Sequence, residues 1–169
     1  MPDPRTDLPA AFDERSLLTT MLGYARATAV AKCEGISAED AAAAPLPSSP
    51  LMTVGGIVNH LRWVEYWWFD VIFLGGADQG PWTEDDPDRE MRLGARTPLG
   101  KVIAAYETES ARHDRLVAGT DLSATAQRPI RAGAHVTLGW ILHHLIEETA
   151  RHNGHLDILR ELADGTKGA

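Results

Sequence analysis

Three polar side chains stand where a helical apolar pattern predicts core residues: His60, Glu148 and His152. Glu148 and His152 are four residues apart, so on a helix both side chains project from the same face. His60 lies in the middle of a second apolar stripe, between Ile57 and Val64. Burying an unpaired carboxylate or imidazole is costly, so three such groups facing one core need a common explanation.

A divalent metal ion supplies such an explanation. Two histidines and one carboxylate bind one ion and leave coordination positions open, as in catalytic zinc sites and some non-haem iron sites. We expect Zn²⁺ first, with Ni²⁺ or Fe²⁺ as alternatives. His155, one step further along the stripe, would either close the site as a fourth ligand or orient the other ligands through hydrogen bonds.

Ordinary packing is the competing interpretation of the same residues. A single histidine on an apolar face is usually a hydrogen-bonded core residue, and Glu148 has an ion-pair partner close by in Arg151. The pattern Glu-x-x-x-His also occurs often by chance. Only the combination of this pattern with His60 on a second segment supports a metal site as strongly as ordinary packing.

Further residues are predicted to line a pocket beside these ligands. They lie on inner stripes or next to a candidate ligand, and they are Trp63, Trp67, Glu109 and His144. His113, on the same stripe as Glu109, is a candidate proton acceptor. Cys33 is the only cysteine of the chain, and with no histidine one turn away it is predicted to be a small buried hydrophobe rather than a nucleophile.

Four helical segments are predicted from the apolar spacing, and they cover residues 13–33, 53–74, 97–119 and 137–162. Ser37 and Asp40 resemble a capping box that opens a short turn after the first segment. Residues 77–96 are rich in acidic side chains and are predicted to form a solvated loop. Because no segment shows convincing strand alternation, the sequence predicts an all-α fold, a four-helix bundle.

Composition limits the classes of function. The chain has 169 residues, 44% of them hydrophobic, which suits one folded domain and excludes wholesale disorder. A formal net charge of -8 argues against nucleic acid and anionic membranes as partners. The first fifteen residues lack an apolar secretion signal, so we expect a cytoplasmic protein. The domain is expected to span residues 1–169, with a core at about 12–163 and mobile tails at 1–11 and 164–169.

Two segments give the chain a resemblance to a known group of proteins. One is His60-Leu-Arg-Trp-Val-Glu-Tyr-Trp-Trp, and the other is the stretch 137–157, which contains the pattern Glu-x-x-x-His-x-x-His-x-Asp. Together they resemble the DinB-like superfamily and look closest to its mini-circle protein branch. The likeness covers about residues 12–163.

The resemblance implies a four-helix bundle with up-down-down-up topology and a metal held by one histidine from the second helix and a His/Glu-x-x-x-His pair from the fourth. Carried onto this sequence, the ligands are His60, Glu148 and His152. Glu148 replaces the histidine of the three-histidine members, which leaves the identity of the metal open. Relatives in the superfamily include mycothiol-dependent maleylpyruvate isomerase and bacillithiol or mycothiol S-transferases.

The implied function is transfer of a low-molecular-weight thiol such as mycothiol to a small electrophile. Two alternatives from other classes stay open: a metal-dependent hydrolase, in which metal-bound water is the nucleophile, and a non-catalytic metal-binding protein of the stress response. A homodimer is expected because a narrow bundle leaves an apolar face uncovered. Trp63, Tyr66 and Trp68 are the residues predicted at its interface.

Overall fold

The structure is a computed structural model that describes residues 5–168. Within that range the chain is helical and has no β-strand, only an isolated bridge between Thr125 and Thr137. In chain order the elements are α1 (Glu14–Ala31), α2 (Ala38–Ala42), α3 (Val54–Tyr66), the π-helix η1 (Trp67–Phe73), α4 (Arg89–Arg96), α5 (Leu99–Ala118), the 3₁₀-helix η2 (Arg131–Gly133) and α6 (Leu138–Asp164). The predicted all-α class is confirmed.

Side-chain caps explain where four of the helices begin. The cap residues have extended backbones, and each side chain accepts a hydrogen bond from a backbone N–H of the following turn: Asp13, Ser37, Thr53 and Thr137. These N–H groups have no partner inside their helix, so a cap stabilises the helix start. The four long predicted segments agree with the structure to within two residues at each end.

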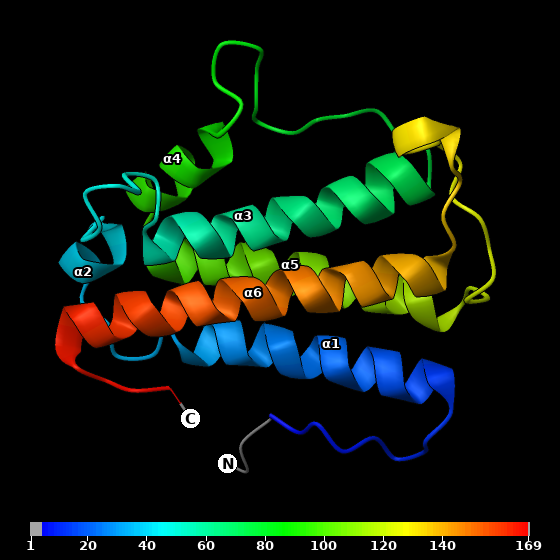
Figure 1. Cartoon of the computed structure of the whole chain (residues 1–169), viewed down its shortest axis with the longest axis horizontal. Coiled ribbons are helices and arrows are strands. Elements are labelled where there is room, and N and C mark those ends of the chain that lie inside the picture. The colour runs from blue at the N-terminus through cyan, green and yellow to red at the C-terminus, as the bar shows by residue number, and fades with distance from the viewer. Residues whose placement is uncertain (1–4, 169) are drawn as a thin grey trace.

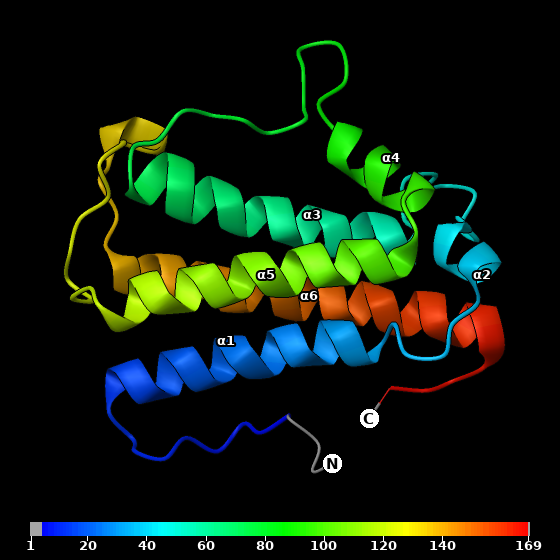
Figure 2. The same cartoon turned by 180° about the vertical axis from the view of Figure 1, so that it is seen from behind.

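The four long helices lie side by side (Figures 1 and 2). α1 and α6 run in one direction, whereas α5 and α3, with its extension η1, run in the other (Figure 1). α1 packs against α6, and α3 packs against both α5 and α6. The short helices α2 and α4 contact each other and α3. They lie near the end of α3 where that helix begins (Figure 1).

A polar layer divides the apolar core at the middle of the long helices. One apolar cluster includes Leu22 and Phe69, and the other includes Ile57 and Leu156. Between the clusters, each long helix contributes buried polar side chains, namely Arg26 from α1, Glu65 from α3, Ser110 and His113 from α5, and Thr149 and Asn153 from α6. Because buried polar groups need hydrogen-bond partners, this layer fixes how the helices are placed along one another.

The end of the second predicted helix differs from the expectation. From Trp67 the chain forms a π-helix, whose wider turn breaks the repeat of 100° per residue. As a result Leu74, predicted on the inner face, is 47% exposed, while Phe69 is completely buried. The regular helical period still predicted Val71 correctly, which lies in η1 and is completely buried, but it was wrong for Leu74.

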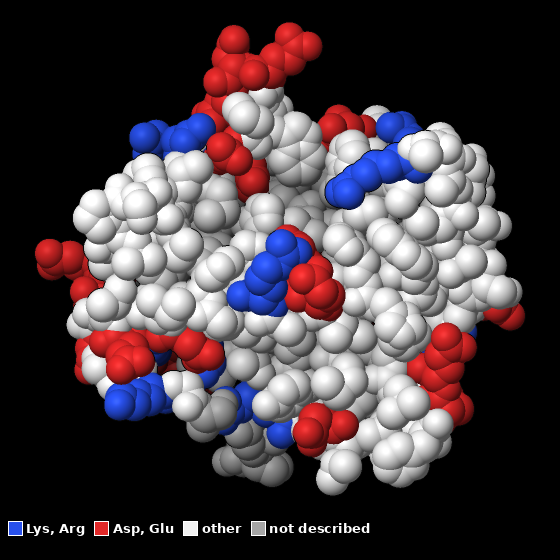
Figure 3. All heavy atoms as spheres, viewed as in Figure 1, with Lys and Arg blue, Asp and Glu red and all other residues white. Residues whose placement is uncertain are grey.

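The prediction of a loop over residues 77–96 was wrong for its second half, which forms α4. This helix carries four charged side chains in eight residues, a composition that conceals its packing face. Only Glu90 and Gly94, four residues apart, are buried. The first half is a loop as predicted, and acidic side chains gather on it (Figure 3).

The expected domain limits and mobile tails stay predictions. Of the tails, residues 1–4 and 169 lie outside the described residues. Among the residues that the structure does describe, no helix is both long and apolar enough to cross a membrane.

Candidate metal centre

His60, Glu148 and His152 meet between α3 and α6, and their ligand atoms all lie within 4.8 Å of one another. Glu148 Oε1 is 3.2 Å from His152 Nε2 and 3.6 Å from His60 Nε2. The side chains are 25%, 14% and 16% exposed, respectively. The structure thus brings together the three residues that the sequence selected, at a place that a small solute can reach.

Helix geometry explains this convergence. Glu148 and His152 are separated by one turn of α6, so they share a face. α3 packs against α6, and this packing places the His60 ring opposite that face. The centroids of the His60 and His152 rings are 5.0 Å apart. Two long rigid helices therefore supply all three groups.

Glu90, which the sequence analysis did not select, holds the other side of the His60 ring. Its Oε1 atom lies 3.1 Å from His60 Nδ1, and the Glu90 side chain is only 7% exposed. This contact leaves Nε2 of His60 directed at Glu148. A carboxylate behind a metal-ligating histidine fixes the orientation of the ring and raises its basicity. Glu90 is therefore a positioning residue for this centre.

Close backbone packing fixes α4, and with it Glu90, against α3. A Cβ atom at Gly55 of α3 would lie 2.7 Å from the carbonyl oxygen of Gly94 in α4, so these two glycines permit the approach. Asn59 Nδ2 also donates a 2.7 Å hydrogen bond to the carbonyl oxygen of Glu90. The sequence signal for α4 was the pair Glu90 and Gly94, which is too short to stand out among charged neighbours.

Two further residues contact the ligands from outside. Arg151 donates a hydrogen bond to Glu148 Oε2, as the packing interpretation predicted, and leaves Oε1 directed at the two histidines. His155 Nδ1 lies 3.3 Å from His152 Nδ1. Since Nδ1 of His152 is the nitrogen away from Glu148, this contact gives His155 the place of an orienting residue.

Contacts among these residues shift their proton equilibria. Burial lowers the pKa of His60, but hydrogen bonds to Glu148 and Glu90 outweigh burial and raise that pKa to about 9. Hydrogen bonds to His152 and His60 hold the pKa of Glu148 far below its ordinary value. At neutral pH, Glu148 is therefore ionised and His60 carries a proton in the metal-free protein. A metal ion would have to displace that proton.

Three of the predicted pocket residues pack against other aromatic rings. Trp63 and Trp67 both meet the ring of Trp82, with centroids 5.9 and 6.0 Å apart. His144 stacks on Trp140 at 5.3 Å and meets Trp68 edge-on at 4.6 Å. The loop tryptophan Trp82, which the sequence analysis left in a solvated loop, thus covers the aromatic residues that follow His60.

His113 and Glu109 belong to a second group of potential ligands, together with Asp70. His113 is completely buried, and its two ring nitrogens lie 3.2 Å from Glu65 Oε2 and 3.0 Å from Asp70 Oδ2. Both nitrogens are thus engaged by carboxylates of α3 and η1. These contacts tie His113 to the polar layer of the core, so the geometry does not support the prediction that it accepts a proton at the His60 centre.

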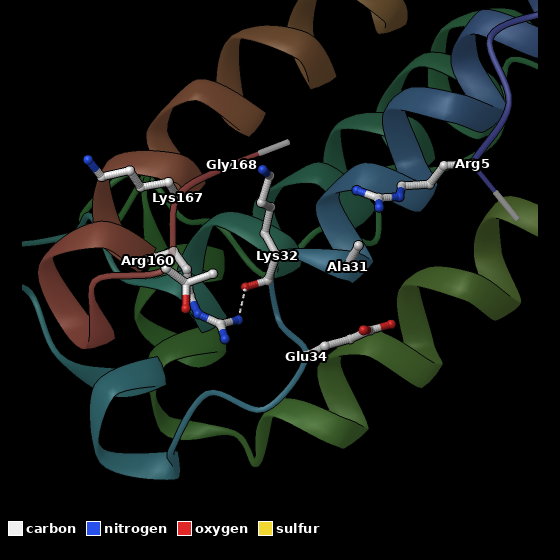
Figure 4. A pocket seen from close by; sticks show the side chains of 8 residues that line it. Arg5, Ala31, Lys32, Glu34, Arg160, Lys167 and Gly168 are labelled. Atoms are coloured by element: carbon white, nitrogen blue, oxygen red, sulfur yellow. Dashed lines mark hydrogen bonds between the residues drawn. The ribbon is translucent and has the colours of Figure 1, made fainter. Parts of the chain in front are cut away.

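A basic hollow lies where α1 and α6 end, and the residues that line it include no histidine or cysteine. Arg160 and Lys32 line it, together with Lys167 (Figure 4). Arg160 donates to the carbonyl oxygen of Lys32 at 2.8 Å and to Asp164 at 2.9 Å. Since cations near helix C-termini satisfy the last carbonyl groups, these contacts give Arg160 a structural role at the ends of α1 and α6.

The donor set at His60 fits a divalent ion. Two imidazole nitrogens and one ionised carboxylate oxygen are the ligands that Zn²⁺, Ni²⁺ and Fe²⁺ accept. The nitrogen of each histidine opposite the centre is 3.1 or 3.3 Å from a polar atom of Glu90 or His155. The described chain is thus a helical protein with three partly buried side chains, two histidines and one carboxylate, that could hold one divalent ion.

Comparison with known families narrows this class. The family model described as mycothiol S-transferase matches residues 17–165, which is most of the chain. The chain therefore belongs to the mycothiol S-transferase family, and the predicted membership of the DinB-like superfamily is confirmed. No curated protein sequence matches the chain.

Proposed function

We propose that this protein is a divalent-metal-dependent transferase that joins a low-molecular-weight thiol such as mycothiol to a small electrophile. The observation that carries the proposal is the convergence of His60, Glu148 and His152 within 4.8 Å. Membership of the mycothiol S-transferase family supports the thiol as co-substrate.

Each residue of the centre has a distinct role in this proposal. His60 and His152 would bind the ion through Nε2, and Glu148 would bind it through Oε1. Glu90 keeps the His60 ring turned toward the ion. Arg151 holds the second oxygen of Glu148, so that the carboxylate presents one oxygen to the ion.

The nucleophile must come from outside the chain. Cys33 is the only cysteine, it is buried, and burial raises the pKa of its thiol to about 12. An ordinary thiol has a pKa of about 8.5 and is mostly protonated at neutral pH. A bound divalent ion supplies the missing chemistry, because coordination favours the deprotonated thiol. His60, Glu148 and His152 would hold that ion between α3 and α6.

A transfer assay with matched variants tests this function. Zinc-loaded protein is incubated with mycothiol and an alkyl halide, beside Glu148→Ala and Glu147→Ala. Glu147 is the adjacent residue on α6 and is 59% exposed, so its loss serves as the control. We expect transfer by the native protein and by the control. In Glu148→Ala we expect the transfer rate to fall at least a hundredfold, as it does in other enzymes that lose a group stabilising the transition state.

Two results would contradict the proposal. One is absence of thiol transfer while a known mycothiol S-transferase is active in the same assay. The other is hydrolysis of an ester panel without any thiol, which would favour the metal-dependent hydrolase. Binding of zinc with neither activity would favour the non-catalytic role, for which a fourth ligand at His155 is the expected feature.

The finer features of the protein belong to the same proposal. We propose Zn²⁺ as the native ion, before Ni²⁺ or Fe²⁺, and a cytoplasmic location, where thiols are kept reduced. We propose one domain with up-down-down-up topology, which the directions of α1, α3, α5 and α6 support (Figure 1). A homodimer is proposed as well, with Trp63, Tyr66 and Trp68 at its interface.

A further inference from the structure

An apolar cavity of about 280 Å³ lies beside the candidate metal centre. Leu51, Met52, Ile57 and Met91 form most of its lining, and His152 and His155 form the side next to the centre. No lysine, arginine or carboxylate is among the residues that line it. Pro50, at its rim, is exposed, so the cavity is open to solvent on that side.

The elements that build this cavity are those that build the metal centre. Ile57 lies one turn before His60 on α3, and Met91 follows Glu90 on α4. The imidazole of His152 belongs to both sites. The contacts that orient the ligands therefore also fix the distance between the cavity and the place where a thiol would be held.

We infer that this cavity binds the electrophile, and that the electrophile is an uncharged, apolar molecule about as large as one substituted aromatic ring. The inference rests on the proposed transferase function. The size follows from the volume, because a dry cavity of about 150 Å³ already holds benzene. The absence of charge follows from the lining away from the two histidines, where Leu51, Met52, Ile57 and Met91 offer a buried charged group no partner.

Benzyl chloride illustrates the reaction that such a site would support. The thiol sulfur forms a bond to the benzylic carbon, and the carbon–chlorine bond breaks. Chloride leaves with the bonding electron pair, and the thiol proton passes to solvent. The products are the benzyl thioether and hydrogen chloride, so no oxidant or reductant takes part.

Binding of an unreactive analogue tests the cavity without any need for transfer. The affinities of toluene and 4-methylbenzoate for the zinc-free protein are measured by ligand-observed NMR, without thiol, because a bound zinc ion would itself bind the carboxylate. We expect toluene to bind at least about tenfold more tightly than 4-methylbenzoate, because the carboxylate loses its hydration against an apolar wall. Equal affinities, or tighter binding of 4-methylbenzoate, would overturn the inference.

Matched variants locate the binding. Met91→Gln and Leu51→Gln each place an amide in the cavity, whereas Met21→Gln makes the same change on α1, where Met21 is 38% exposed. We expect a loss of toluene affinity of about fivefold or more in the two cavity variants and none in the control. Circular dichroism confirms that each variant is folded. Unchanged affinity in both folded cavity variants would contradict the inference.

Turnover separates this inference from the proposed function. With mycothiol, we expect the native protein to prefer benzyl chloride over 4-(chloromethyl)benzoate at least about tenfold in kcat/KM, and Met91→Gln to reduce that preference. Transfer without any preference would overturn the cavity assignment and leave the transferase standing. Toluene binding without transfer would overturn the transferase and leave the cavity assignment standing. A change of Met91→Gln from dimer to monomer at unchanged toluene affinity would make the cavity a contact between copies, against the inference.

Discussion

Two groups of histidine and carboxylate in this molecule meet the same distance criterion but have different surroundings. His60, Glu148 and His152 lie within 4.8 Å of one another, and so do the ligand atoms of the second group, Asp70, Glu109 and His113. In the second group, Arg112 Nη2 lies 2.5 Å from both carboxylates and 3.0 Å from His113 Nε2. The guanidinium thus occupies the place where an ion would have to lie.

In the first group, no arginine of the described residues lies between the three ligand atoms. Arg151 reaches only Oε2 of Glu148, on the side away from the two histidines. The comparison teaches that residue types and spacing do not separate a metal site from an ion-pair network. The position of the nearest arginine does, because an arginine at the centre satisfies the carboxylates and an arginine outside leaves them available.

The second group, Asp70, Glu109 and His113, is connected to buried residues of the core through His113. Arg26 donates to both oxygens of Glu65 at 2.7 Å, and Glu65 is also 3.2 Å from His113. Burial alone would raise the pKa of Glu65, but the charges and hydrogen bonds of Arg26 and His113 together lower it. The network therefore joins α1, α3 and α5, and we assign it to stability and the first group to chemistry.

The largest expected effect is on stability, from the substitution Glu65→Gln. It leaves Arg26, 8% exposed, without its bidentate partner, and breaking a buried pair in this way costs about 3–5 kcal/mol. Urea denaturation measures the loss, with Glu107→Gln on the exposed face of α5 as the control. Zinc affinity of the folded fraction should be unchanged. A cost below about 1 kcal/mol would refute the structural role.

The next effect is on metal affinity, from Glu90→Gln. This change removes the charge behind His60, and loss of such a partner typically weakens metal binding by 10–100-fold. Competition with a zinc indicator measures the affinity, and Glu84→Gln in the acidic loop is the control. If Glu90→Gln binds zinc as tightly as the control, Glu90 does not position the ligand.

Zinc affinity should also depend on pH. His60 must lose a proton to bind zinc, and its pKa is raised to about 9, so protons compete below that pH. We expect affinity to rise roughly tenfold per pH unit between pH 6.5 and 8. In Glu90→Gln the pKa of His60 falls, so the affinity should level off at a lower pH. A flat profile in the native protein would contradict the assignment.

The smallest expected effect comes from Arg112→Gln, at the exposed end of the network. Arg112 is 40% exposed, so solvent screens its ion pairs and their loss should cost at most about 1 kcal/mol. Zinc affinity at the His60 centre should not change. A cost as large as that of Glu65→Gln would show that the network does not weaken toward the surface.

Much of the fold could be predicted from the sequence because local signals specify it. Caps at Asp13, Thr53 and Thr137 mark helix starts, and the apolar spacing places His60, Glu148 and His152 on inner faces. The i, i+4 relation on one long helix needs no tertiary information. These features are local, and the structure agrees with them.

The rest depends on contacts between distant segments. Glu90 reaches His60 only because Gly55 and Gly94 let α4 approach α3, and a pair of glycines carries no signal of its own in the sequence. The buried role of Glu65 was missed because its partner Arg26 lies 39 residues away. The contacts of His113 with Glu65 and Asp70 could not be predicted for the same reason, since a helical stripe predicts burial but not the partner.

The metal content of gently purified protein tests the central claim most directly. Native protein, Glu148→Ala and Arg112→Gln are compared by elemental analysis, before and after reconstitution with Zn²⁺, Ni²⁺ or Fe²⁺. The account predicts about one ion per chain in the native protein and in Arg112→Gln, and none in Glu148→Ala. No metal in the reconstituted native protein, or equal loss in both variants, would contradict it.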